Sequence, residues 1–220
     1  MKKIVILTFC ILQFSIASKS QETNSKKNID LELGLGYNTI NWESSSLNDD
    51  IKLNRNQFAI LPSLKLKYSI PLSELKNNST FGITPFVGYN MFGGKSKEEP
   101  NGYKDMIRLQ SFEIGLLPTY TLNNRLNIYG GLKGQYIFSA KNKSYGSIVD
   151  PIEAEREWET NDISESIKDL SFNIGAGFNY KINRFLFGIE TWFGISNLSN
   201  MEGLKIYENN YRLIIGYRIK

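Results

Sequence analysis

The 220-residue sequence predicts an all-β protein, an eight-stranded antiparallel up-and-down barrel. Apolar and polar residues alternate with a period of two in eight separate runs, which is the pattern of strands with one apolar face. The strands are expected to be long, roughly twelve to fourteen residues, against the roughly five to six of strands in soluble proteins. Long and short connections alternate between them, which places all long loops at one end of an up-and-down sheet.

The predicted strands follow one another along the chain with few interruptions. Their apolar residues span 31–37, 58–70, 81–91, 112–120, 126–138, 170–180, 185–195 and 207–219. Three prolines, Pro62, Pro85 and Pro118, fall inside these runs. Because proline cannot donate to a strand ladder, each is expected to remove a hydrogen bond or to mark a bulge.

The connections predict where the two ends of the barrel lie. Segments 43–55, 93–106, 140–168 and 197–206 are long or polar, and segments 71–79, 122–125 and 182–184 are shorter. Asn123 and Asn124 suit a tight hairpin because asparagine tolerates positive φ. With an even number of strands, both termini are expected at the end that carries the short turns.

The N-terminus has the three parts of a secretory signal peptide. Met1, Lys2 and Lys3 form a basic start, 4–16 is apolar but too short to span a bilayer, and cleavage is expected between residues 17 and 21. The single cysteine, Cys10, follows Phe9, which is too large for a lipoprotein signal. We therefore expect a signal peptide at 1–20, a polar lead at 21–28 and a barrel domain at 29–220.

A period of two does not reveal which face of the strands meets water. A soluble lipocalin-like barrel turns its apolar face inward, whereas an outer-membrane barrel turns it toward lipid. Aromatic residues near the ends of the runs, a final run that reaches the end of the sequence, and glycines on the polar face, such as Gly115 and Gly175, favour lipid. A narrow lumen needs small residues, and a surface in water does not. The expected fold is a transmembrane β-barrel, with a soluble exported lipocalin-like binding protein as an alternative.

At this point the chain resembles a known group of proteins. The segments "FGITPFVGYNMF" and "LLPTYTLNNRLNIYGGLKGQY" and the terminal "LIIGYRIK" are similar to those of small outer-membrane β-barrel proteins, of the OmpA/OmpX/OmpW type and the PorT-like barrel family. The resemblance implies residence in outer-membrane lipid and recognition of the C-terminal strand by the barrel-assembly machinery. Lys220 departs from the commonest signal, which ends in an aromatic residue.

The composition argues against catalysis and against several kinds of binding site. The chain has no histidine, and its one cysteine lies in the expected signal peptide, so no catalytic, cofactor-binding or metal-binding residues are predicted. Loss of Lys2, Lys3 and Lys19 leaves a nearly neutral chain, which gives no electrostatic reason to bind nucleic acid.

Charged residues on the polar face are the first candidate site. A charge inside a barrel must be paired or must reach water, so these residues are interpreted either as a salt-bridged plug or as the filter of a narrow channel. They are Glu32, Lys65, Lys67, Glu113, Lys133, Lys181, Glu190, Arg212 and Arg218.

The connection 140–168 is the second candidate. Asp150 as N-cap, Pro151 at the first helical position and Glu153 as capping-box partner predict a short acidic helix that carries Trp158. Its acidic and aromatic side chains could bind cations or a partner protein, or could simply be solvated. They are Asp150, Glu153, Glu155, Glu157, Trp158 and Glu159.

Together these features predict a monomeric, non-enzymatic outer-membrane protein without cofactors. Its expected role is structural or interactive, in envelope integrity, adhesion, or an export or motility assembly. A narrow channel for small solutes is the alternative within the same fold.

Overall fold

The computed structural model describes residues 27–44, 51–55, 60–75, 78–96, 104–145 and 158–219. These ranges contain ten strand segments and one short 3₁₀ helix, η1 (Ser164–Ser166). The strands are β1 (Asn28–Ser44), β2 (Ile51–Arg55), β3 (Ile60–Leu75), β4 (Ser79–Lys95), β5 (Lys104–Leu122), β6 (Leu126–Tyr145), β7 (Trp158–Asp162), β8 (Leu170–Ile182), β9 (Phe185–Gly194) and β10 (Leu204–Arg218).

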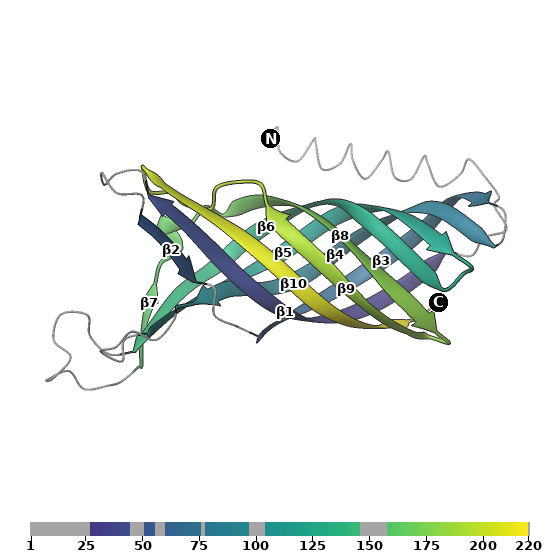
Figure 1. Cartoon of the computed structure of the whole chain (residues 1–220), viewed down its shortest axis with the longest axis horizontal. Helices are drawn as coiled ribbons and strands as arrows, with labels where there is room; N and C mark the ends of the chain where they lie inside the picture. Colours follow the sequence, from purple (N-terminus) through teal and green to yellow (C-terminus); the bar gives the residue numbers. More distant parts are fainter. Residues whose placement is uncertain are drawn as a thin grey trace, which may run out of the picture.

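Eight of these strands form a closed antiparallel ring in the order β1, β3, β4, β5, β6, β8, β9, β10 (Figure 1). The ring closes between the first and last strands, which pair from Asp30↔Arg218 to Ser44↔Leu204. The short strand β2 continues the β3 side of β1, and β7 continues the β8 side of β6. The predicted eight-stranded up-and-down barrel is therefore confirmed, with two extra segments at one end.

The burial pattern of the ring is the reverse of that in a soluble barrel. Leu33 and Leu213 are 59% and 65% exposed, whereas Lys133 and Glu190 are 2% and 1% exposed. The outer surface is thus apolar and the charged side chains of the strands lie in the interior, as in an outer-membrane barrel. This arrangement rules out the lipocalin-like alternative.

The short turns depend on asparagine. Asn123 and Asn124 between β5 and β6, Asn183 between β8 and β9, and Asn78 before β4 all have φ between 50° and 56°. Asparagine is one of the few residues other than glycine that adopt this left-handed backbone conformation at a low energetic cost. The prediction of a tight hairpin at Asn123-Asn124 is confirmed.

The strands are longer than the sequence predicts, so the limits of several connections were wrong. At the long-loop end β1 reaches Ser44, β4 reaches Lys95, β5 starts at Lys104 and β6 reaches Tyr145. At the other end β3 reaches Leu75, inside the expected connection 71–79. The ends of these strands extend beyond the bilayer and have no lipid-facing side. Their outward residues are therefore mostly polar, and the alternation of apolar and polar residues that predicts a strand is absent there.

The predicted helix at Trp158 was also wrong. Trp158 and Glu159 lie in the strand β7, where Trp158 pairs with Tyr145 and Glu159 with Ser144 of β6. The extended edge of β6 offers backbone hydrogen bonds that a short isolated helix cannot match. Asp150, Glu153, Glu155 and Glu157 lie outside the described residues, as do the expected signal peptide and most of the polar lead.

The three prolines inside the predicted runs do not shift the register of the barrel. Pro62 pairs with Leu35, Pro85 with Leu116 and Pro118 with Ile83. The irregularities in the β3–β4 and β5–β6 ladders lie elsewhere, at Pro71/Ser73 and at Gln110/Ser111. A bulge at the predicted prolines is therefore not found.

Aromatic side chains gather at both edges of the outer apolar surface. Near the long-loop end, the rings of Tyr89, Phe112 and Phe138 contact one another, with Phe112 and Phe138 at 4.9 Å between centroids. Near the turn end, Phe185 packs edge-on against Tyr217 at 5.5 Å. Such paired belts are typical of barrels at the two lipid–water interfaces. Among the described residues, no helix has the length and apolar character needed to span a membrane.

Candidate functional site: the interior of the barrel

The inward positions of β6 show how the interior is arranged. From the turn end to the loop end, β6 presents Asn127, Tyr129, Lys133, Gln135 and Ile137 to the inside. Each of these residues belongs to a different layer: an open polar vestibule, an aromatic layer, a charged layer, an amide layer and an apolar cap. Strand pairing brings the matching residues of the other strands to the same levels.

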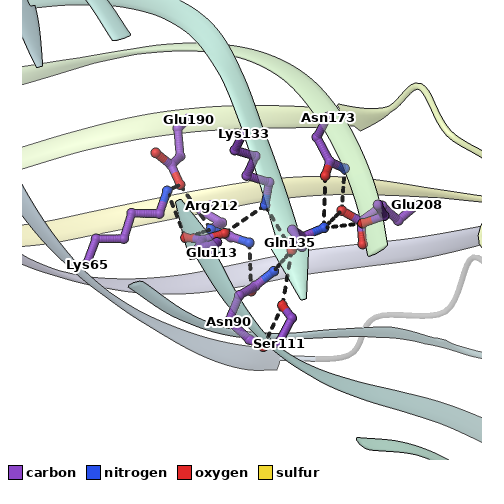
Figure 2. A network of polar contacts seen from close by, with 11 residues as sticks. Lys65, Asn90, Ser111, Glu113, Lys133, Gln135, Asn173, Glu190, Glu208 and Arg212 are labelled. Atoms are coloured by element: carbon purple, nitrogen blue, oxygen red, sulfur yellow. Dashed lines mark hydrogen bonds and ion pairs between the residues drawn. The ribbon is translucent and has the colours of Figure 1, made fainter. Parts of the chain in front are cut away.

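The charged layer consists of Lys65, Glu113, Lys133, Glu190 and Arg212, whose side chains point toward one another (Figure 2). Lys133 Nζ lies 2.8 Å from Glu113 Oε2, and Arg212 Nη1 lies 3.1 Å from Glu190 Oε1. Lys65 Nζ forms an ion pair with Glu190 Oε1 and lies 3.7 Å from Glu113 Oε1. All five side chains are at most 2% exposed, so three cations and two carboxylates form one desolvated network.

A second buried pair lies on the turn side of this network. Lys67 Nζ is 2.6 Å from Glu32 Oε2, and Asn179 donates a hydrogen bond of 3.3 Å to Glu32 Oε1. The ammonium group of Lys67 also lies 4.3 Å from the ring centroid of Tyr129. An aromatic face and a carboxylate therefore share the charge of this lysine.

The amide layer is organised by Gln135. Its Oε1 accepts hydrogen bonds from Asn90, Ser111 and Lys133, and its Nε2 donates to Asn173 and Glu208 at 2.8 and 2.6 Å. Asn173 also donates to Glu208. Arg212 Nη2 donates to Asn90 Oδ1 at 2.7 Å, which joins this layer to the charged one (Figure 2).

The aromatic layer fills the cross-section beside the charges. Phe86, Leu117, Tyr129 and Trp192 form a buried cluster, with Phe86 and Trp192 at 5.9 Å between ring centroids. Glycine makes room for these rings. A Cβ at Gly115 would lie 2.3 Å from Phe86, one at Gly175 would lie 2.5 Å from Trp192, and one at Gly177 would lie 2.9 Å from Tyr129. The crowded lumen therefore requires the small residues on this face.

An apolar cap closes the loop end. Ile167 and Leu198, from the segments that follow η1 and β9, are 3% and 1% exposed. They pack with inward side chains from the barrel wall, namely Ile40, Phe92, Ile107, Leu109, Ile137, Ala140 and Ile206. Lys168 N donates to Leu198 O at 2.7 Å, and Asn200 Nδ2 donates to Ile167 O at 3.0 Å. These bonds tie the two segments together across the mouth.

The turn end is open by comparison. A polar cavity of about 510 Å³ lies there, lined by Thr84, Thr119, Thr121, Asn127, Lys181 and Arg218 among others. Arg218 makes a two-point contact with Asp30, with distances of 2.8 and 2.9 Å. This vestibule ends at the aromatic layer.

Seven of the nine charged residues proposed from the sequence lie in the two buried groups: Glu32, Lys65, Lys67, Glu113, Lys133, Glu190 and Arg212. Arg218 pairs with Asp30 instead, and Lys181 lies at the vestibule. The prediction did not include Asp30, Gln135, Asn173 or Glu208. Glu208 shares the polar face with Arg212, so strand parity could have identified it.

The geometry restricts what the interior can do chemically. The two carboxylates of the charged layer, Glu113 and Glu190, each already contact a cation, so neither is free to act as a base. Among the described residues, no group of three or more acidic, histidine or cysteine side chains could hold a metal ion. The arrangement instead joins strands β3, β5, β6, β9 and β10 through their side chains.

Comparison with known proteins agrees with the fold. Residues 17–200 match a family described as "Outer membrane protein beta-barrel domain". No curated protein sequence matches the chain.

Several solved structures are similar in outline. Ail of Yersinia pestis, in complex with the heparin analogue sucrose octasulfate, is 16% identical; the match covers 87% of this chain and 99% of that one, with a TM-score of 0.41. Neisserial surface protein A is 9% identical; the match covers 88% of this chain and 97% of that one, with a TM-score of 0.44. The protease OmpT of Escherichia coli is 12% identical; the match covers 92% of this chain and 100% of that one, with a TM-score of 0.45. Because the family match covers most of its length, the chain belongs to the outer membrane protein beta-barrel family.

Proposed function

We propose that this protein is a closed, non-enzymatic barrel of the outer membrane whose work is structural or interactive. The observation that carries the proposal is the succession of blocked layers inside the ring. An ion that entered the vestibule would meet the aromatic layer, the charged network, the amide layer and the apolar cap in turn. Eight strands enclose an interior that side chains can fill, and here they do so at four levels.

The charged network supports a plug more than a selectivity filter. A filter needs charged groups that face water and exchange partners with a passing ion. Lys133 and Glu113 are both fully buried and 2.8 Å apart, and Arg212 is held by Glu190 and Asn90. Parting these groups would expose uncompensated charges in a medium of low dielectric constant.

Planar-bilayer recording of the purified protein tests this proposal. The closed barrel is expected to show little steady conductance, and Glu190→Gln is expected to lower stability without creating ion selectivity. A large, reproducible conductance whose selectivity changes in Glu190→Gln would overturn the plug and favour the narrow channel.

The lack of enzymatic activity is part of the same proposal. The chain has no histidine, which removes the usual general base for hydrolysis. The paired state of Glu113 and Glu190 leaves no carboxylate of the charged layer to replace it.

We also propose how the chain reaches the membrane. Residues 1–20 are removed as a signal peptide, 21–28 form a polar lead, and the domain at 29–220 inserts as a monomer after the barrel-assembly machinery binds the C-terminal strand. Mass spectrometry of the outer-membrane form tests the first step. A mature N-terminus between residues 18 and 21 supports cleavage, and an intact Met1 would contradict it.

The loop end is the expected place for contact with a partner. Trp158 is 48% exposed and packs on Tyr145 at 5.4 Å between ring centroids. Asp150, Glu153, Glu155, Glu157 and Glu159 add acidic charge to the same segment of the chain. Exposed aromatic residues beside charge are common at protein interfaces, so this segment is the proposed site for an unknown protein partner.

A further inference from the structure

Cations are concentrated on the outer face of the barrel at its loop end. Lys104 of β5 lies 5.0 Å from the ring centroid of Tyr145, and four other cations lie nearer the lipid. Lys95 of β4 and Lys143 of β6 both flank Met106 of β5, and Arg108 of β5 pairs directly with Lys141 of β6. The alternate residues of β5, Asp105, Ile107 and Leu109, are buried, so these four side chains point away from the interior. Lys95, Arg108, Lys141 and Lys143 are called the basic face below.

The basic face violates a rule of sheet stability. Directly opposite like charges destabilise an antiparallel pair, yet Arg108 and Lys141 occupy such a pair. Within the described ranges none of the four makes an ion pair within 4 Å; Asp162, which pairs with Lys141 in the β6–β7 ladder, is the acid on this face. A local conflict of this kind is typical of a binding surface.

The height of the basic face above the lipid is set by the aromatic side chains. On β5 the continuous run of outward apolar residues ends at Phe112, and Arg108 lies four residues beyond it. Four residues advance about 13 Å along a strand, or about 10 Å in height at a tilt of about 40°. The headgroup region begins at the edge of the hydrocarbon core, so the long side chains of Arg108 and Lys141 can reach it.

The cations occupy two levels and one side of the barrel. Lys95 and Lys143 lie one outward position further from the lipid than Arg108 and Lys141, which is about 5 Å in height. On the β10 side, the first two outward positions beyond Tyr211, Asn209 and Tyr207, are uncharged, and the third is Lys205. The positive charge is therefore concentrated in the β4–β6 sector and does not form a uniform collar.

We propose that the basic face binds the headgroup of an anionic membrane lipid that carries more than one phosphate. Guanidinium and ammonium groups both bind phosphate oxygens, and arginine can do so at two points. Two levels of cations match phosphates at two depths in one headgroup. Continuity with the aromatic residues of the lipid-facing surface favours a lipid over a soluble polyanion.

Native mass spectrometry of the detergent-purified protein, titrated with diphosphoryl lipid A, tests the proposal. Wild-type protein is expected to bind this lipid and not phosphatidylcholine. Each cation near an anionic lipid contributes about fivefold to affinity, so Arg108→Gln/Lys141→Gln should weaken binding by about 25-fold. The matched control, Lys168→Gln/Lys205→Gln, removes two exposed lysines of the same end outside the basic face and should change affinity by less than about twofold.

Two further measurements are the unfolding of Arg108→Gln/Lys141→Gln and the binding of a soluble polyphosphate to the wild-type protein. Because Arg108 and Lys141 repel each other, their replacement by glutamine should leave unfolding unchanged or raise stability while affinity falls. Equal affinity of wild type and Arg108→Gln/Lys141→Gln for the lipid would overturn the proposal. Inositol hexakisphosphate that binds wild type as tightly as diphosphoryl lipid A would also overturn it, in favour of a soluble polyanion.

Discussion

Glu190 of β9 and Arg212 of β10 are directly opposite each other in the strand ladder, and their side chains form a buried ion pair of 3.1 Å. Lys65 reaches the same carboxylate from β3, on another side of the barrel. One glutamate thus connects three strands. This relationship makes the charge of Glu190, and not only its shape, important for the closed barrel.

Glu190→Gln should therefore destabilise the barrel strongly. The substitution keeps the size of the side chain but leaves Lys65 and Arg212 with less compensating charge. Removal of one partner from a buried ion pair costs about 3–5 kcal/mol. Urea unfolding in phospholipid vesicles would measure the loss, with the exposed Glu202→Gln as a control that changes stability by less than about 0.5 kcal/mol.

A second variant separates charge from packing. Lys65→Met/Glu190→Gln removes one cation together with one anion, so it should recover much of the stability lost in Glu190→Gln. If the double variant is less stable than Glu190→Gln alone, the cost does not come from uncompensated charge.

Leu213→Arg should destabilise the barrel from the opposite face. Leu213 is 65% exposed on the outer surface, between the aromatic side chains of Tyr211 and Tyr217. Arginine at the midplane of a bilayer costs about 2–4 kcal/mol and much less near the interfaces. Ile195→Arg, just beyond the end of β9, is the depth control. Equal losses for the two variants in vesicle unfolding would mean that Leu213 does not face lipid.

The two faces of the barrel could be predicted from the sequence because strand side chains alternate strictly. On a strand, every second residue counted from Lys133 therefore also points inward, until a bulge shifts the pattern. The same logic identified seven members of the buried groups, although it did not show which carboxylate meets which cation. Those pairings form between strands that lie across the lumen from each other, as between Lys65 of β3 and Glu190 of β9. A pattern along one strand does not indicate them.

The ends of the strands and the apolar cap could not be predicted in this way. Trp158 follows capping signals for a helix, but pairing with Tyr145 of β6 prevailed. Ile167 and Leu198 lie in segments without alternating apolar and polar residues. They are buried only because the closed ring of strands leaves an opening at the loop end, into which they pack. Strand parity places Glu208 on the inner face, but its partners there are the amide groups of Gln135 and Asn173, which a pattern of opposite charges does not indicate.

Leu198→Ala should loosen the apolar cap without opening the ring. Leu198 is 1% exposed, and replacement of a buried leucine by alanine costs about 2–5 kcal/mol in a well-packed site. The amides of Lys168 and Asn200, which bond across the cap, should exchange faster with deuterium, while those of β9 and β10 keep their protection. Met201→Ala, at an exposed neighbour, should leave the exchange pattern unchanged. Unaltered exchange in Leu198→Ala would show that the cap does not depend on this side chain.

Single cysteines should label from opposite sides of the membrane. Asn161 lies exposed in β7 at the loop end, and Arg125 lies exposed in the β5–β6 turn at the other end. With both chain termini on the inner side, a membrane-impermeant maleimide added to intact cells should label Asn161→Cys and spare Arg125→Cys. Permeabilised cells should label both variants, which shows that each thiol is accessible. The native Cys10 lies in the expected signal peptide and should not contribute to the signal of the mature protein. Labelling of Arg125→Cys but not Asn161→Cys on intact cells would invert the barrel and move the basic face to the inner leaflet.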